Sequence, residues 1–270
     1  MKMLTYKEYY QDCSKSNSVY DFSYKVLSGD FFGQNYIDSV KKANADLNKK
    51  LKDDANIYTP KGTNKKQQPL SRLKDPWDLT SIENIAQHVI PYLEQNIFKC
   101  NAYVHGCYVY KTKVGTYSLD SVGSLKWHID NHPKEVIKVM VYLNDVCIES
   151  APFEILTNQE DQGIKHQTTR IDYKRWKKSP TRFTEEFIQG YESSGAQRLK
   201  ITGSAGTVCY FDNNVLHRAN FAEKRDRNVI VFMAKPSSKE FEKYISKEYT
   251  GTNYHIDVFK DPEFIGANKK

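Results

Sequence analysis

The chain has 270 residues, 39% of them hydrophobic and 13% aromatic, and it carries a formal net charge of +7. This composition excludes a disordered protein, because disordered chains lack the aromatic and branched side chains that offset chain entropy. The longest apolar runs, 139–143 and 229–234, are far shorter than the roughly 20 residues of a membrane-spanning helix. The charged N-terminus forms no secretory signal, so we expect a cytoplasmic protein without a membrane partner.

Two amphipathic helices are predicted in the first hundred residues, because apolar side chains recur there at intervals of three and four. They cover 35–53 and 82–97, and Asp78 and Thr80 are candidate caps of the second. The segment between them, 54–78, is rich in proline and polar residues and is predicted to be a long loop.

From Ala102 onward the chain changes to short runs of Val, Ile, Tyr and Phe, which predict an antiparallel β barrel or sandwich. These runs are 102–112, 136–143, 152–156, 207–211 and 228–234. A second polar insertion, 157–181, precedes a helix predicted to open near Thr181, with Phe183, Phe187 and Tyr191 on one side. Insertions of this length between barrel strands are expected over the barrel mouth, and the tail from Ser237 is expected to add a helix.

The five cysteines are an odd number without CxxC spacing, which favours buried thiols over disulfides. They are Cys13, Cys100, Cys107, Cys147 and Cys209.

A candidate metal site begins at Trp127-His128-Ile129-Asp130, where a strand ends. Because side chains alternate along a strand, His128 and Asp130 project to the same side. His217, after a later apolar strand, is the candidate third ligand. Two imidazoles and one carboxylate leave three open positions on an octahedral ion, as in non-haem Fe(II) oxygenases. A keto acid can occupy two of them and O₂ the third.

A keto-acid cosubstrate also needs a partner for its distal carboxylate, and the planar fork of a guanidinium suits that role. Arg227 stands directly before the apolar run 228–234. Arg225 is the alternative because a residue two positions earlier on a strand would face the same side. His132 is a competing ligand, but Pro133 opposes the helix that would align it with His128.

The tripeptide His255-Ile256-Asp257 repeats the His-x-Asp pattern with no strand, histidine or arginine after it. We therefore interpret it as a chance copy without a metal site.

At these residues the sequence resembles the Fe(II)/2-oxoglutarate-dependent dioxygenase superfamily, most closely its phytanoyl-CoA dioxygenase-like branch, over roughly 80–235. The resemblance rests on Trp127-His128-Ile129-Asp130, on 142–146 and 151–156, on 203–207, and on His217-Arg218-Ala219 with Arg227. It implies a mainly β protein with flanking helices, built on a double-stranded β-helix (jelly-roll, cupin-like) barrel. We expect a single oxygenase domain over 1–270, with a helical flank over about 1–100, the barrel over about 101–235 and an extension over about 236–270.

The resemblance also implies Fe(II) held by His128, Asp130 and His217, with 2-oxoglutarate clamped by Arg227 and O₂ as co-reactant. Because Asp130 stands where halogenating relatives have a small residue, the expected reaction is hydroxylation of an unactivated C–H bond in a small, possibly anionic molecule. Ala219 and Val229 occupy positions where relatives often offer a hydroxyl, so Tyr110 or Tyr108 is the predicted additional cosubstrate-binding residue.

Two alternatives stay open at this point. The net charge and the basic cluster from Lys174 to Arg182 suggest a dioxygenase acting on nucleic acid or protein, although the cluster also suits an anionic small molecule. The second alternative is a non-catalytic cupin-like binding protein. Neither the substrate nor the oligomeric state follows from the sequence.

Overall fold

The computed structural model describes residues 22–58, 69–99, 102–115, 123–130, 136–166 and 181–236. Its strands form two antiparallel sheets, one of seven strands in the order β1-β10-β6-β12-β4-β3-β2 and one of five in the order β8-β5-β11-β7-β9. The strands of the larger sheet are β1 Tyr24–Leu27, β2 Ile57–Tyr58, β3 Leu70–Leu73, β4 Ala102–Thr112, β6 Ile137–Tyr142, β10 Val208–Asp212 and β12 Arg227–Pro236. Those of the smaller sheet are β5 Trp127–His128, β7 Phe153–Thr157, β8 Arg182–Phe183, β9 Gln197–Ile201 and β11 His217–Arg218.

The centre of the seven-stranded sheet is formed by β12, which pairs with β4 along its whole length and with β6 on its other side. Side chains alternate between the two faces, as β-strand geometry requires. On β12, Ile230 and Phe232 belong to the core cluster shared with the helices, whereas Val229 and Val231 belong to a second cluster between the sheets. The site residues of this sheet therefore lie at inward-facing positions.

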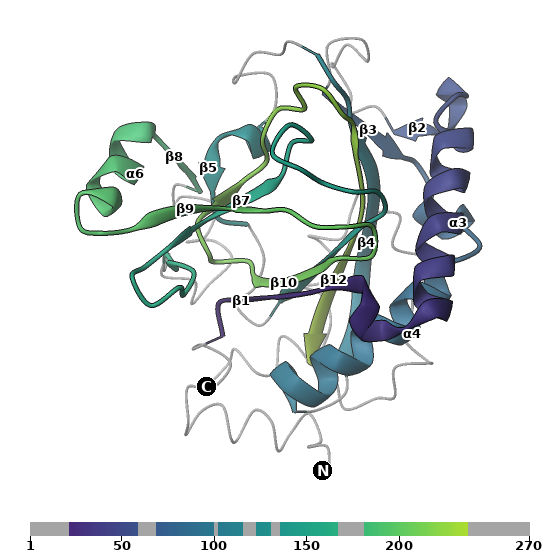
Figure 1. Cartoon of the computed structure of the whole chain (residues 1–270), viewed down its shortest axis with the longest axis horizontal. Helices are drawn as coiled ribbons and strands as arrows, with labels where there is room; N and C mark the ends of the chain where they lie inside the picture. Colours follow the sequence, from purple (N-terminus) through teal and green to yellow (C-terminus); the bar gives the residue numbers. More distant parts are fainter. Residues whose placement is uncertain are drawn as a thin grey trace.

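Two helices, α3 (Gln34–Lys50) and α4 (Ile82–Leu93), cover the outer face of the seven-stranded sheet, and Figure 1 shows them side by side there. The apolar residues whose spacing predicted the helices form the buried face of each helix, and Val40, Ala43 and Leu47 are fully buried on α3. A short π-helical segment, Glu94–Phe98, extends α4. Burial of the apolar faces of the two helices stabilises the larger sheet. The inner face of this sheet points towards the smaller sheet.

The five-stranded sheet lies on the other side of the cavity, with α6 (Glu185–Glu192) beside it (Figure 1). Its strands β5, β8 and β11 have only two residues each. The expectation of a mainly β, double-stranded β-helix architecture with flanking helices is confirmed, and the predicted strands match β4, β6, β7, β10 and β12 to within a few residues.

The segment 54–78 is less irregular than its composition predicts. Of its described residues, β2 and β3 extend the edge of the large sheet, because β3 pairs with β4. Ser81, and neither Asp78 nor Thr80, stands at the N-terminus of α4, and Asp78 pairs with Lys50.

The helix expected near Thr181 begins four residues later, because the Thr184 side chain caps it at the Phe187 N–H while Arg182 and Phe183 pair with β5. Within the described chain, Cys107 and Cys209 are buried free thiols, whereas Cys147 is half-buried, contrary to expectation.

Parts of the predicted features lie outside the described residues. These are Cys13, Cys100, His132, the tripeptide at 255–257, the tail from Ser237, residues 59–68 and 167–180 of the two insertions, and the basic cluster except Arg182. None of the described helices is both long and apolar enough to cross a membrane.

Candidate metal centre

The two candidate histidines meet because β5 and β11 pair in an antiparallel register that sets His128 directly opposite His217. Directly opposed residues project to the same face, and the two ring centroids lie 4.2 Å apart. Asp130 follows β5, and its backbone N–H donates to the Asn213 carbonyl at 2.8 Å. The turn leading into β11 thus also fixes the backbone of the carboxylate, and the three predicted ligands come together.

The spacing of these side chains fits a single metal ion. Potential ligand atoms of His128, Asp130 and His217 all lie within 4.8 Å of one another. Asp130 Oδ2 is 3.3 Å from Nε2 of His217, and Asp130 Oδ1 is 4.0 Å from Nε2 of His128. Neighbouring ligand atoms about 2.1 Å from one octahedral ion are about 3 Å apart, so a small movement would close the set around an ion.

Both imidazoles have Nε2 available as the metal-binding nitrogen. Nδ1 of His128 donates to the Lys126 carbonyl at 2.8 Å, and Nδ1 of His217 donates to the Val215 carbonyl at 2.7 Å. With the proton held on Nδ1, each Nε2 keeps its lone pair for a metal. Burial, reinforced by the neighbouring His217, holds the pKa of His128 well below its usual range, so its imidazole is neutral at physiological pH.

A lysine that the sequence analysis did not select contacts the carboxylate. Nζ of Lys138 lies 2.7 Å from Oδ2 of Asp130, inside the barrel. Burial alone would raise the pKa of Asp130, but the neighbouring Lys138 ammonium outweighs it and holds that pKa well below its usual range. Asp130 is therefore ionised, as a metal ligand requires. A single charge within the apolar run 136–143 is the signal that could have identified Lys138.

Arg227, the predicted clamp, is fully buried at the start of β12 and lines the same cavity. Its Nη2 donates to Thr112 Oγ1 at 3.4 Å, while its Nε and Nη1 are buried without a hydrogen-bond partner among the described residues. Unpartnered donors on a buried guanidinium suit an anionic partner such as a carboxylate. Arg225, the alternative, is exposed and does not line the cavity.

Three hydroxyl-bearing residues near Arg227 lie on β4. Thr112 pairs with Arg227 in the sheet register, and Tyr110 and Tyr108 follow on the same inward face. Tyr110 and Tyr108 were predicted from the sequence, whereas Thr112, whose hydroxyl contacts Arg227, was not. Burial raises the pKa of Tyr110, so its phenol keeps its proton and can donate a hydrogen bond to an anion.

The cavity between the sheets has a volume of about 190 Å³, below the 300–1,000 Å³ typical of ligand sites. Its lining includes the three candidate ligands, Arg227, Tyr110 and Tyr108, together with Lys138, Ser124 and Arg182. Such a volume suits a small cosubstrate, with a further molecule bound at the opening.

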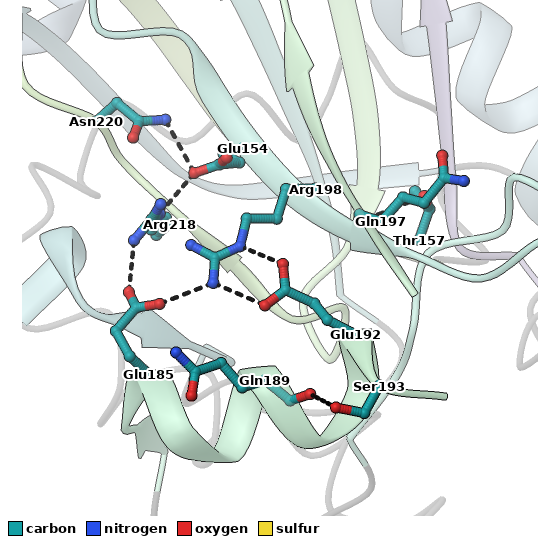
Figure 2. A network of polar contacts seen from close by, with 10 residues as sticks. All are labelled: Glu154, Thr157, Glu185, Gln189, Glu192, Ser193, Gln197, Arg198, Arg218 and Asn220. Atoms are coloured by element: carbon teal, nitrogen blue, oxygen red, sulfur yellow. Dashed lines mark hydrogen bonds and ion pairs between the residues drawn. The ribbon is translucent and has the colours of Figure 1, made fainter. Parts of the chain in front are cut away.

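The smaller sheet and α6 are joined by a network of charged residues (Figure 2). Arg218, next to His217, donates to the buried Glu154 at 2.5 Å and to Glu185 at 2.8 Å. Arg198 links Glu185 to Glu192. The Arg218 guanidinium also lies 4.8 Å from the Trp127 ring centroid, a cation–π distance. Each candidate ligand histidine therefore has a strand neighbour anchored on the opposite face.

Comparison with known proteins finds similarity in structure only. No protein-family model and no curated protein matches the sequence. The α-ketoglutarate-dependent epimerase SnoN, solved with Fe³⁺, α-ketoglutarate and nogalamycin RO, matches with a TM-score of 0.54 and 13% identity, over 82% of this chain and 81% of that one. The α-ketoglutarate-dependent carbocyclase SnoK from nogalamycin biosynthesis matches with a TM-score of 0.54 and 12% identity, over 87% of both chains.

EctD from S. alaskensis, solved with 2-oxoglutarate and 5-hydroxyectoine, matches with a TM-score of 0.51 and 15% identity, over 83% of this chain and 75% of that one. The chain is thus a structural match to iron- and 2-oxoglutarate-dependent enzymes, and at these identities the likeness establishes the fold.

Proposed function

We propose that this protein is an Fe(II)- and 2-oxoglutarate-dependent dioxygenase that hydroxylates an unactivated C–H bond of a small molecule. In this proposal His128, Asp130 and His217 bind the iron, and Arg227 binds the distal carboxylate of 2-oxoglutarate. Tyr110 is proposed to donate a hydrogen bond to the same cosubstrate.

One observation carries the proposal. A buried guanidinium with two unpartnered N–H donors lies in the same small cavity as a convergent His-Asp-His set. A buried charge without a partner is costly, so its retention is explained by a ligand that completes it. A diacid with one end at the metal and the other at Arg227 satisfies both groups.

When bound, the iron and 2-oxoglutarate supply the oxidising chemistry, in which O₂ converts the diacid to succinate and CO₂ and oxygenates the substrate. The chain itself contributes position and exclusion of water. The Lys126 and Val215 carbonyls fix the orientation of the two imidazoles. Lys138 keeps Asp130 ionised, and the apolar side chains of Phe153, Phe211 and Met140 line the cavity around them.

The substitution Asp130→Ala tests the ligand assignment. We expect stoichiometric Fe(II) binding, measured anaerobically by calorimetry, to fall by at least about 100-fold, and succinate release to cease. Asp38→Ala, which removes an exposed carboxylate on α3, serves as the matched control and should change neither value. Retention of full Fe(II) affinity in Asp130→Ala would contradict the proposal.

Hydroxylation can be distinguished from the epimerase and carbocyclase reactions named for SnoN and SnoK by the mass of the product. Asp130 favours hydroxylation over halogenation because it leaves no open coordination site for a halide. Hydroxylation adds one oxygen atom to the substrate, epimerisation leaves the mass unchanged, and ring closure removes two hydrogens. Mass spectrometry under ¹⁸O₂ therefore decides the reaction type, and labelled oxygen in the product is the expected result.

A further inference from the structure

The cavity carries more positive charge than the iron site and its cosubstrate require. Among the described residues lining it, Lys138, Arg182 and Arg227 are cationic and Asp130 alone is acidic. A ferrous ion would add two positive charges, and 2-oxoglutarate would bring two negative ones. The filled site therefore keeps a net charge of +2, which favours a further anion.

Of the three cations, Arg182 has no assigned partner in the site. Lys138 pairs with Asp130 at 2.7 Å, and Arg227 lies beside Thr112 with two donors available for the cosubstrate. Arg182 forms no ion pair with any described residue. It is the cation left for another molecule.

The strand register puts Arg182 beside the metal site. His128 on β5 lies opposite His217 on β11 on one side and opposite Arg182 on β8 on the other. Directly opposed residues share a face, so the guanidinium side chain and the two imidazoles form one row across three strands. Adjacent strands are about 4.8 Å apart, and β8 is the edge strand of the sheet.

The contacts of Arg182 fix one end of its guanidinium and leave the other end available. Its Nη1 lies 3.1 Å from the Thr181 carbonyl, 3.3 Å from the Thr181 hydroxyl and 3.4 Å from the Ile129 carbonyl. Within the described chain, no hydrogen bond uses its Nε or Nη2. Arg182 is exposed and yet lines the cavity, so its side chain lies at the cavity opening.

We propose that Arg182 is a substrate-binding residue and that the substrate carries an anionic group, a carboxylate or phosphate, which this guanidinium binds at the cavity opening. The inference rests on the proposed function, because the anion matters only as the anchor of a substrate next to the iron. An anchor one strand away from His128 would limit the distance between the anionic group and the reacting C–H bond. The substrate is therefore expected to be a small organic acid or phosphate ester.

A purely structural role for Arg182 makes a different prediction. The Ile129 and Thr181 carbonyls need only an N–H donor, which glutamine also offers. Anion binding needs a positive charge, which lysine keeps and glutamine loses. The variants Arg182→Gln and Arg182→Lys therefore separate the two roles.

The experiment uses the anaerobic protein saturated with Fe(II) and 2-oxoglutarate, so that Arg227 is already occupied. Matched probes, benzoate with benzamide and phenyl phosphate with phenol, are titrated by calorimetry. We expect at least one anion to bind about tenfold or more tightly than its neutral partner. That preference should vanish in Arg182→Gln, persist in part in Arg182→Lys, and remain unchanged in Lys200→Gln, which removes an exposed charge from β9 of the same sheet.

Three outcomes would overturn the inference: no measurable binding of either anion, equal affinity within both pairs, or an anion preference that survives in Arg182→Gln. The Fe(II) and 2-oxoglutarate affinities of the same samples test the proposed function separately. If both bind and the anion preference is absent, the inference about Arg182 fails alone. If the wild-type protein binds neither, the proposed function fails.

Discussion

The two sheets of this protein are stabilised in different ways. The larger sheet has long strands and packs an apolar face against α3 and α4, with Val139, Ile230 and Phe232 fully buried. The smaller sheet contributes two-residue strands to the site, and charged residues hold its outer face. The long strand β12 carries Arg227, and the short strands β5 and β11 carry the two histidines.

This difference indicates how a metal site can be fixed on weak elements. A strand of two residues has few ladder hydrogen bonds, so its position depends on side-chain anchors. Trp127 and Arg218 each adjoin a candidate ligand histidine in sequence, and they contact each other on the outer face. We therefore expect stability to depend mainly on the larger sheet, and metal affinity to respond more to the smaller one.

The largest effect on stability is expected from Phe232→Ala. The substitution leaves a cavity between β12 and the helices and should lower the free energy of unfolding by about 3–5 kcal/mol, measured by urea denaturation. Phe31→Ala removes a ring that is 61% exposed and should cost far less. The Fe(II) affinity of the folded Phe232→Ala protein should remain close to that of the wild type. A stability loss equal to that of Phe31→Ala would contradict the comparison.

A smaller loss of stability, together with a change in metal binding, is expected from Glu154→Gln. This substitution removes the negative charge from the Glu154–Arg218 ion pair, which should destabilise the fold by about 1–3 kcal/mol. Because Arg218 anchors the strand of His217, Fe(II) affinity measured by calorimetry should fall by up to about tenfold. Glu149→Gln, which breaks an exposed pair with Lys224, is the control and should leave Fe(II) affinity unchanged. Unchanged Fe(II) affinity in Glu154→Gln would show that the network supports only the fold.

The smallest effect is expected at Glu94, beside the larger sheet. Burial raises the pKa of this carboxyl, although the Ala102 N–H donates to it at 2.7 Å and opposes the shift. A raised folded-state pKa means that the native protein binds the proton more tightly, so stability is lost as pH rises through that pKa. Glu94→Gln keeps an oxygen that accepts the Ala102 hydrogen bond, and it removes the loss of stability because the amide does not ionise. Its melting temperature should exceed that of the wild type at neutral pH, and the difference should shrink as the pH falls towards 4. A constant difference across this range would refute the linkage.

Local patterns were sufficient for much of the fold. The periodicities over 35–53 and 82–97 correspond to α3 and α4, and the apolar runs correspond to the main strands. The strand β3 was missed because four residues in a proline-containing segment give no usable alternation, and its pairing with β4 is a long-range contact. The start of the helix expected near Thr181 was misplaced because Arg182 and Phe183 pair with β5, and Thr184 caps the helix after that pairing.

The candidate site divides in the same way. The sequence by itself determined which residue types could form a metal site, because His128 and Asp130 are two residues apart at the end of a predicted strand and Arg227 begins an apolar run. Only the tertiary structure decided that His217 lies opposite His128, that Arg227 is buried beside Thr112 while Arg225 is exposed, and that Lys138 and Arg182 line the cavity. The physical reason is that a strand pattern specifies which face a side chain occupies, whereas the pairing partner of each strand depends on contacts between distant parts of the chain.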